Sequence, residues 1–159
     1  MSRLPQLEYR AEFLHGWPRA NGLHMNYQSD DATLTNGDLV VPVAGGKVKR
    51  VDAAGKAHGV GIIVRGPADD KSVRVAGGIA AGDGRKVVGG GNTCIVLFGG
   101  YIVRTNAFDD TATYVEGDAV NASAAGVFGK AASADPVLGT VLEVETLSDG
   151  KKALVILVR

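Results

Sequence analysis

The stretch NGDLVVPVAGG, residues 36–46, determines the predicted fold, because a weaker copy of it, EGDAVNASAAG, follows at residues 116–126. The offset is about 80 residues, and self-similarity at a fixed offset indicates a repeated structural unit. No gap is needed to place Asp30 on Asp110, Gly59 on Gly139 and Val64 on Val144. The sequence therefore predicts an internal duplication.

Each copy has the pattern of a small antiparallel β unit. Gly-Asp favours a turn, since glycine accepts a positive φ and aspartate can hydrogen-bond its own backbone two residues on. An apolar strand, a glycine-containing reversal, a second strand and a third strand led by glycine follow in turn. Two such units would bury their apolar faces on each other, which predicts an all-β protein, either a small barrel or a sandwich.

The rest of the chain divides around these copies. We expect an extended N-terminal arm over residues 1–28 and a β domain over residues 29–159. Within the β domain, the first repeat is placed at about 30–79, an insert hairpin at about 80–109 and the second repeat at about 110–159. Further strands are predicted at 72–76, 93–98 and 153–158.

The N-terminal arm differs from the β domain in composition. It is rich in large apolar side chains, yet proline and glycine interrupt it where a long helix would need to continue. Two interpretations stay open: the arm folds back over its own barrel, or it lies on another protein or another copy, since interface cores are rich in such side chains. In the second case the predicted partner-binding anchors are Tyr9, Phe13, Leu14, Trp17 and Tyr27.

The composition bounds the possible partners. Among 159 residues, 17 basic side chains balance 17 acidic ones, so the net charge is zero. This balance argues against nucleic acid or an anionic membrane as the main partner and favours docking on a protein surface. The N-terminus lacks the layout of a signal peptide, and no apolar run reaches the length of a membrane span. The lone Cys94 lies in an apolar strand and is predicted to be a core residue.

Signals for catalysis, cofactors or metals are weak. The glycines at 89–91 precede no Gly-Lys-Ser/Thr ending, so no phosphate loop is predicted. The histidines have no ligand spacing, and the aspartate pairs at 30–31, 69–70 and 109–110 fit solvated turns better than calcium loops. No serine stands in a nucleophile elbow. We expect no catalytic residue, no cofactor, no metal and no enzymatic activity, and we expect Asp38 and Asp118 to be turn residues.

A resemblance to a known family comes from the second half of the chain. The residues that carry it are the run Gly117-Asp118-Ala119-Val120, the glycine turn at Gly126, the strand at 137–144 and the closing stretch DGKKALVIL at 149–157. Together they resemble the small capsid decoration, or cement, proteins of tailed bacteriophages. In style the resemblance extends over residues 30–159.

The resemblance implies a virion structural protein that binds the outer surface of the phage head and stabilises the shell. Its implied partners are the major capsid protein and neighbouring copies of itself, as a dimer or trimer, without direct contact to nucleic acid or membrane. Its implied location is the outer capsid surface, after synthesis in the host cytoplasm. The alternative that the residues leave open is a carbohydrate- or ligand-binding β module of a phage tail or another assembly, using the glycine-rich loops near Gly45 and Gly89.

Overall fold

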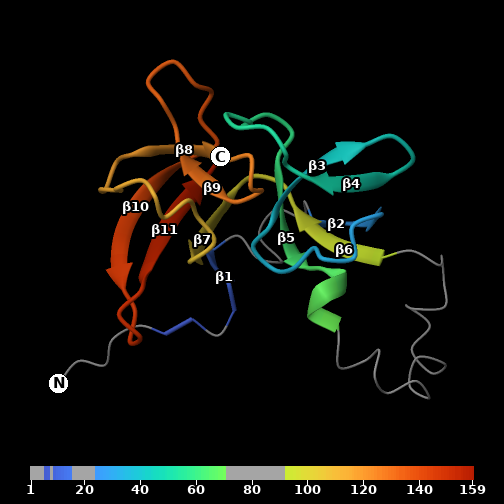
Figure 1. The fold of residues 1–159 in the computed structure, drawn as a ribbon, viewed down its shortest axis with the longest axis horizontal. Helices are drawn as coiled ribbons and strands as arrows, with labels where there is room; N and C mark the ends of the chain where they lie inside the picture. Colours follow the sequence, from blue (N-terminus) through green and yellow to red (C-terminus); the bar gives the residue numbers. More distant parts are fainter. Residues whose placement is uncertain (1–5, 8, 16–23, 71–91) are drawn as a thin grey trace.

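The computed structural model describes residues 6, 7, 9–15, 24–70 and 92–159, which form an all-β protein (Figure 1). The elements in chain order are β1 Ala11–His15, β2 His24–Ser29, β3 Leu39–Val43, β4 Lys47–Arg50, β5 Gly61–Arg65, the 3₁₀ helix η1 Pro67–Asp70, β6 Asn92–Leu97, β7 Tyr101–Thr105, β8 Ala119–Ala122, β9 Phe128–Lys130, β10 Gly139–Thr146 and β11 Lys152–Val158. The predicted fold class is confirmed. The strand expected at residues 72–76 lies outside the described residues.

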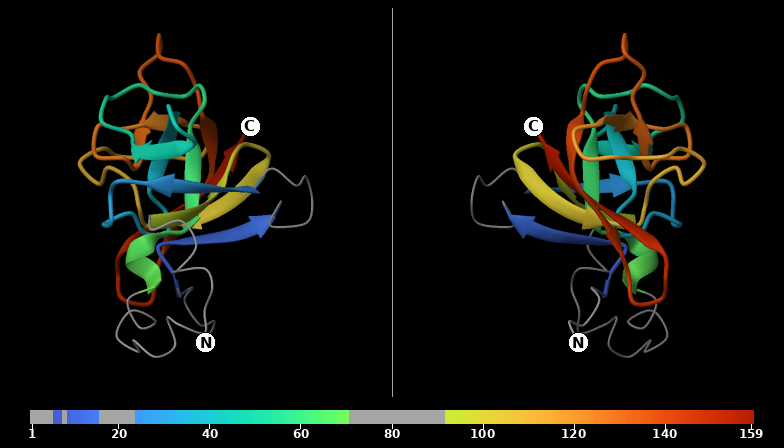
Figure 2. Two further views of the ribbon diagram at one scale, coloured as in Figure 1. Left: turned by 90° about the vertical axis from the view of Figure 1, so that its right-hand side faces the viewer. Right: turned by 90° about the vertical axis from the view of Figure 1, so that its left-hand side faces the viewer.

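The strands form two bodies that lie side by side (Figure 1). Strands β2, β4, β3, β5 and β6, in that order, close into a five-stranded barrel, which we call the first unit. A six-stranded sheet has the order β1-β7-β11-β10-β8-β9, and its strands β7 to β11 are called the second unit. Figure 2 shows the strong twist of the β10–β11 hairpin, drawn in orange and red, which is the longest pair of strands in the second unit.

The two units repeat the same Gly-Asp turn. Gly37 and Gly117 both have a left-handed backbone, with φ angles of 91° and 90°. Glycine adopts this conformation without the steric penalty that a Cβ atom brings. The carbonyl of the following aspartate then accepts a hydrogen bond from the third strand at 2.8 Å in both units, from Ile63 N in the first and from Val141 N in the second. The duplication is therefore present in the backbone as well as in the sequence.

The third strand of each unit corrects the sequence alignment. Gly61 and Gly139 occupy the same register position, each opposite the second residue of the neighbouring strand β3 or β8. The ungapped overlay predicts Gly59 as the equivalent of Gly139, and this is wrong. A β-bulge follows at the same distance in both strands, between residues 63 and 65 and between residues 141 and 143. The equivalence therefore continues along the whole strand.

The strands of the first unit close into a ring, and the second unit has a single bridge at a comparable place. In the first unit β2 pairs with β4 in parallel, at Gln28 and Lys47, which completes the barrel. In the second unit a parallel bridge between Phe108 and Phe128 lies at the corresponding place. Closure matters because an open sheet edge presents unpaired backbone groups to other chains.

The predicted insert hairpin at about 80–109 lies partly outside the described residues, at 80–91, and its described strands β6 and β7 do not pair with each other. Strand β6 pairs with β2 and β5, whereas β7 pairs with β1 and β11, and no pairing between β6 and β7 occurs in the described part of the chain. Strand β6 is the last strand of the first unit, and β7 is the first strand of the second. The sequence overlay misses this, because the connection before β6 is much longer than the tight β10–β11 turn that precedes β11.

The prediction of a separate arm over residues 1–28 is also wrong for the residues that the structure describes. Strand β1 pairs antiparallel with β7, and β2 pairs antiparallel with β6 along its whole length. Both segments are therefore parts of the sheets. A strand of five or six residues carries too little alternation for its sequence to distinguish it from an extended arm.

Each unit has its own apolar core, and the two cores are made by equivalent residues. The core of the first unit comprises Leu34, Val40, Val48, Ile63, Cys94 and Val96. Their counterparts in the second unit are Tyr114, Val120, Phe128, Val141, Leu154 and Ile156, all of them buried. Removing each large apolar side chain from water stabilises the fold by about 1.5–3 kcal/mol. The prediction that Cys94 is a core residue is confirmed.

The two units also share a common apolar layer. One continuous cluster contains Leu39 and Ile62 of the first unit together with Leu138 and Val158 of the second. Backbone hydrogen bonds lie at its edge: Leu39 N donates to Gly126 O at 2.7 Å, and the amide of Ala122 donates to the carbonyl of Lys56 at 2.7 Å. The units are therefore joined by packing and by main-chain contacts.

The Gly126 contact between the units generates a stability prediction. Its φ of 73° is strained for any other residue, and an added Cβ would lie 2.3 Å from Arg50 Cγ. We expect Gly126→Ala to lower the free energy of unfolding by roughly 2–4 kcal/mol, from backbone strain plus displacement of the arginine. Urea unfolding followed by circular dichroism measures the loss.

Gly46 supplies the matched control, since it occupies the equivalent turn of the first unit. It has a φ of 69°, but an added Cβ would meet no atom within 4 Å. Gly46→Ala should therefore show the strain alone, about 1–2 kcal/mol. Equal losses in the two variants would contradict the contact between the units at Gly126.

Candidate functional site

Two of the predicted anchors pack inside the protein. The ring of Phe13 lies edge-to-face on Tyr101 with a centroid separation of 5.6 Å, and the ring of Tyr27 lies edge-to-face on Phe98 at 5.9 Å. Both rings are partly buried against the cores. They stabilise the protein's own sheets, and their role as partner anchors stays a prediction.

The other predicted anchors have different outcomes. Tyr9 is 60% exposed and Leu14 is 52% exposed, so these two side chains remain open to a partner. Trp17 lies outside the described residues. The structure therefore leaves two surface positions from the predicted set, one just before β1 and one within it.

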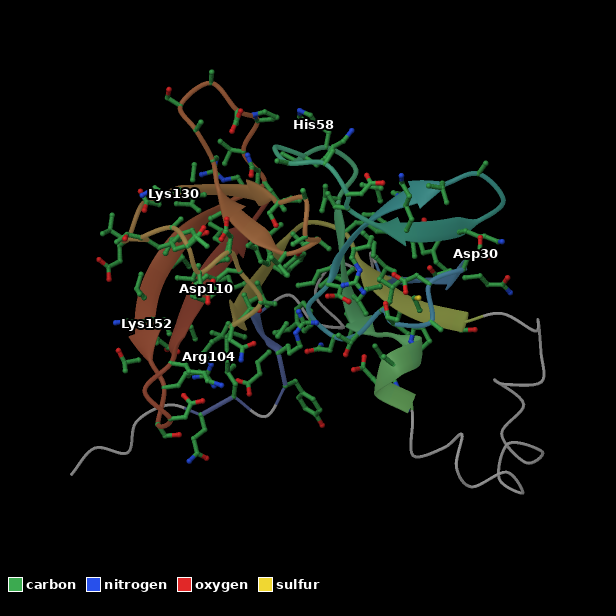
Figure 3. All side chains as sticks on the ribbon, viewed as in Figure 1. Asp30, His58, Arg104, Asp110, Lys130 and Lys152 are labelled. Carbon is green, nitrogen blue, oxygen red and sulfur yellow. The ribbon has the colours of Figure 1, made fainter. Side chains whose placement is uncertain are left out.

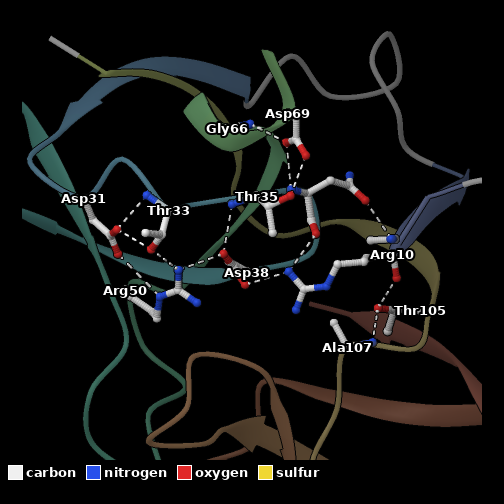
Figure 4. Close-up of polar contacts among 12 residues, drawn as sticks. Arg10, Asp31, Thr33, Thr35, Asp38, Arg50, Gly66, Asp69, Thr105 and Ala107 are labelled. Atoms are coloured by element: carbon white, nitrogen blue, oxygen red, sulfur yellow. Dashed lines mark hydrogen bonds and ion pairs between the residues drawn. The ribbon is translucent and has the colours of Figure 1, made fainter. Parts of the chain in front are cut away.

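A buried polar cluster at the start of β3 is the most elaborate side-chain arrangement of the described residues (Figure 4). Asp38 is fully buried, and its two carboxylate oxygens have different partners. Oδ1 accepts from Arg10 Nη1 at 2.9 Å. Oδ2 accepts from Thr35 N at 2.9 Å and lies 3.2 Å from Arg50 Nη2. We call this cluster the Asp38 network.

Two further side chains extend the Asp38 network to β1 and to η1. Asn36 accepts from Ala11 N at 2.7 Å and donates to Val64 O at 2.9 Å. Asp69, in η1, accepts from the backbone amides of Asn36 and Gly66, each at 2.8 Å. These bonds fix the loop between β2 and β3 against three other segments.

The chemistry of the Asp38 network is that of a structural clasp. A buried carboxylate is costly unless it is paired and hydrogen-bonded, and both oxygens of Asp38 meet that condition. Arg10 comes just before β1, which pairs with the second unit, whereas Asp38 and Arg50 belong to the first unit. The ion pairs therefore tie the two units together through the N-terminal strand.

The second unit has a reduced version of this clasp. Asp118 Oδ2 accepts from Val115 N at 2.8 Å and lies 2.8 Å from Lys130 Nζ, as Asp38 relates to Thr35 and Arg50. The hydrogen bond from Lys130 lowers the pKa of Asp118. No second cation contacts Asp118 among the described residues. The predicted role of Asp38 and Asp118 as turn residues is confirmed, and the two carboxylates serve separate turns.

A short Asp-x-Thr turn also occurs once in each unit. Thr33 N donates to Asp31 at 2.8 Å, and Thr111 N donates to Asp109 at 3.1 Å. The threonine hydroxyls bond the same carboxylates, and these side-chain hydrogen bonds lower the pKa of Asp31 and of Asp109. The interpretation of these aspartates as turn residues is confirmed.

Groups that could act as nucleophiles are held in unreactive forms. Burial raises the pKa of Cys94 to about 11 and the pKa of Tyr114 to about 12, and it raises the pKa of Tyr101 as well. All three side chains are therefore protonated near neutral pH. Among the described residues, no three His, Cys, Asp or Glu side chains are grouped to hold a metal ion.

One open cleft lies where loops of both units meet. It has a volume of about 490 Å³ and is lined by Ala54, Phe108, Asp109, Asp110, Ser123, Ala124, Ala125 and Val127. Ser123 Oγ is buried and has no hydrogen-bond partner in the part of the chain that the structure describes. The sequence analysis did not find this cleft, because its residues come from three separate loops.

No known protein family and no curated protein matches this chain. No helix of the described residues is both long enough and apolar enough to cross a membrane. The features that bear on function are therefore the geometry of the surface and the clasp that shapes it.

Asp38→Asn tests the clasp. The substitution keeps the shape of the side chain but takes the counter-charge from Arg10 and leaves Arg50 with Asp31, 3.5 Å from its Nε. Breaking a buried ion pair costs about 3–5 kcal/mol, and because both arginines are about a third exposed we expect a loss of about 2–3 kcal/mol. Urea unfolding measures the free energy of unfolding.

Asp118→Asn is the control for this experiment, since Asp118 holds the same turn in the second unit with one cation in place of two. Its side chain is more accessible than that of Asp38, so water replaces the lost partner. We expect a clearly smaller loss of stability. A loss as large as that of Asp38→Asn would show that the clasp between the units adds nothing.

Proposed function

We propose that the protein is a virion structural protein that decorates the outer surface of a tailed-bacteriophage head and stabilises the shell. Under this proposal its partners are the major capsid protein and neighbouring copies of itself. It acts by binding and requires no catalysis, cofactor or metal. Its location is the outer capsid surface.

The observation that carries the proposal is the arrangement of the residues that resemble decoration proteins. The Gly-Asp turn at Gly117, the strand β10, the Asp149–Gly150 turn and the strand β11 all belong to the second unit. They form one continuous piece of sheet in which β10 pairs with both β8 and β11. A resemblance carried by scattered residues would be weaker support than one carried by a single structural unit.

The physical character of the molecule also suits a role in reinforcement. Two cores, a shared apolar layer and the Asp38 network make a body whose parts are held by different kinds of contact. A body of this kind transmits load between the places where it touches a shell. Weak contacts repeated over many sites give a high overall affinity through effective concentration, so no deep pocket is needed.

The exposed apolar side chains are the candidate contact points. They are Tyr9, Leu14, Val43, Val115, Val137 and Leu142, each between 38% and 60% exposed. Three of the six belong to the second unit, at or near β10. Single exposed apolar residues are common, but a protein that docks on another surface needs such positions.

The decisive experiment mixes the purified protein with empty shells of the phage that encodes it. We expect the protein to co-sediment with the shells, and electron cryo-microscopy should show regular added density on the outer surface. Heating the shells should then disrupt them at a higher temperature when the protein is bound. Shells that stay bare at protein concentrations far above the number of shell subunits would contradict the proposal.

The cleft supports a second candidate, a carbohydrate- or ligand-binding module. Aromatic and carboxylate groups are typical of sugar sites, and Phe108, Asp109 and Asp110 line this cleft (Figure 3 labels Asp110). In this case a glycan array should show saturable binding that Asp110→Asn weakens by about tenfold, the value of one lost charged hydrogen bond. Asp30→Asn, on the first unit, is the control and should bind as the unchanged protein does.

A further inference from the structure

The outward-facing side of the second unit can be defined from its strand register. The side chains of Ile102, Leu157, Thr140 and Ala119 form one row across β7, β11, β10 and β8, because these residues are direct cross-strand partners. Each of the four is neither buried nor fully exposed. The neighbouring residues along each strand, among them Val103 and Ile156, point into the core. We call the side that carries this row the outer face.

The first unit shows what happens to the same row when it is covered. The equivalents of Leu157, Thr140 and Ala119 are Leu97, Ile62 and Leu39, which have the same register relationships. Their exposed fractions are 4%, 0% and 0%, and all three lie in the apolar cluster that joins the two units. The duplicated unit therefore has a row that is buried in one copy and only partly covered in the other.

The outer face is also unequally charged. Glu12 lies directly opposite Arg104, and Arg104 Nε donates to Glu12 Oε2 at 3.1 Å. Arg104 also lies 3.7 Å from Glu145. Glu143, on the same side of β10, is exposed and has no ion-pair partner among the described residues. Glu12 and Glu145 thus share one guanidinium, and Glu143 adds a third carboxylate to the same side.

The acidic side of the outer face has unused capacity to accept hydrogen bonds. Glu145 Oε2 is buried and has no hydrogen-bond partner in the described part of the chain. Burial raises the pKa of Glu145; the Arg104 guanidinium opposes this rise, and the neighbouring Glu143 and Glu12 add to it. A nearby donor or cation would relieve both the desolvation and the repulsion.

The geometry points to the outer face as the surface by which this protein docks on a partner protein that presents an apolar centre flanked by Lys or Arg side chains. This inference rests on the proposed function and names the docking surface that it requires. The apolar row meets the centre of the partner surface, and Glu143 and Glu145 meet its basic side chains. A bulge between residues 141 and 143 leaves Leu142 43% exposed beside these carboxylates, where it adds an apolar contact.

A second copy of this chain fits the outer face less well. Pairing the face with itself brings the carboxylates of two copies into one interface, with only one arginine from each copy to neutralise them. Like charges facing each other across an interface cost several kcal/mol, about 100-fold or more in affinity. A basic partner gains from the same charges.

Two substitutions on the outer face test the inference, each with a matched control on the first unit. Glu143→Lys reverses an exposed charge, and its control is Asp30→Lys, whose side chain is 84% exposed on the opposite side of the molecule from Arg104 (Figure 3). Leu142→Asp removes an apolar contact, and its control is Ala44→Asp, which introduces the same charge at an exposed position of the first unit. Circular dichroism and thermal unfolding verify that all four variants fold.

Binding to empty shells of the phage is measured by co-sedimentation for each variant. We expect both outer-face variants to lose at least about tenfold in affinity, both controls to bind like the unchanged protein, and binding to weaken with rising salt. Full binding by Glu143→Lys and Leu142→Asp, with the unchanged protein also bound, would overturn the docking face while leaving the decoration role intact. No binding by the unchanged protein would overturn both.

One further result would reassign the outer face. If light scattering shows that the free protein is an oligomer and that Leu142→Asp makes it a monomer while shell binding stays complete, the face joins copies of this chain. That outcome overturns the basic partner inferred above. If the mass is the same for all variants, the result supports the basic partner inferred above.

Discussion

The rest of the structure depends on one buried carboxylate. Asp38 is inaccessible to water and balances two guanidinium groups, Arg10 on one oxygen and Arg50 on the other. Arg50 ends a strand of the first unit, whereas Arg10 precedes β1, which extends the sheet of the second unit. An uncompensated charge at this position would cost several kcal/mol, so the N-terminal strand and both units must come together for the carboxylate to be satisfied. The cluster thereby links the assembly of the units to the formation of a single turn.

The duplication explains why the clasp is asymmetric. Both units need the Gly-Asp turn and a cation from the second strand, and these are Arg50 in one and Lys130 in the other. Only the first unit has a neighbour on the far side of its aspartate, namely the segment before β1. The carboxylate of Asp38 is both buried and paired with a second cation, because burying it without that cation would carry a large desolvation cost. Asp118, with one cation and some contact to water, keeps the simpler arrangement.

The sequence was sufficient for the fold class and the turn but not for the arrangement of the strands. Gly-Asp pairs have a local backbone signature, so the turns at Gly37 and Gly117 could be predicted from residue type alone. The assignment of β6 to the first unit and of β7 to the second could not be predicted. The connections within the two units differ in length, so an ungapped overlay of the two sequences loses the correct alignment of the strands. The Asp38 network was equally hidden: Arg10 and Asp69 lie far from Asp38 in the chain, and no spacing rule connects them. Phe13 and Tyr27 show a related ambiguity, since an aromatic side chain suits a core as well as an interface.

The packing of the two units through a shared apolar layer has a consequence for recognition. Each of two equivalent units has both the surface that covers its neighbour and the surface that is covered. When the units pack through these two different surfaces, each surface stays unused on one of the units. In this protein the leftover covered surface is the row Ala119, Thr140 and Leu157. The first-unit equivalents of Ala119 and Thr140 are larger and more apolar, whereas the equivalent of Leu157 is also leucine. Replacement of leucine by alanine and of isoleucine by threonine lets the row meet water. Retention of Leu157 and Ile102, beside Glu143 and Glu145, keeps it suited to a partner that offers both apolar contact and positive charge.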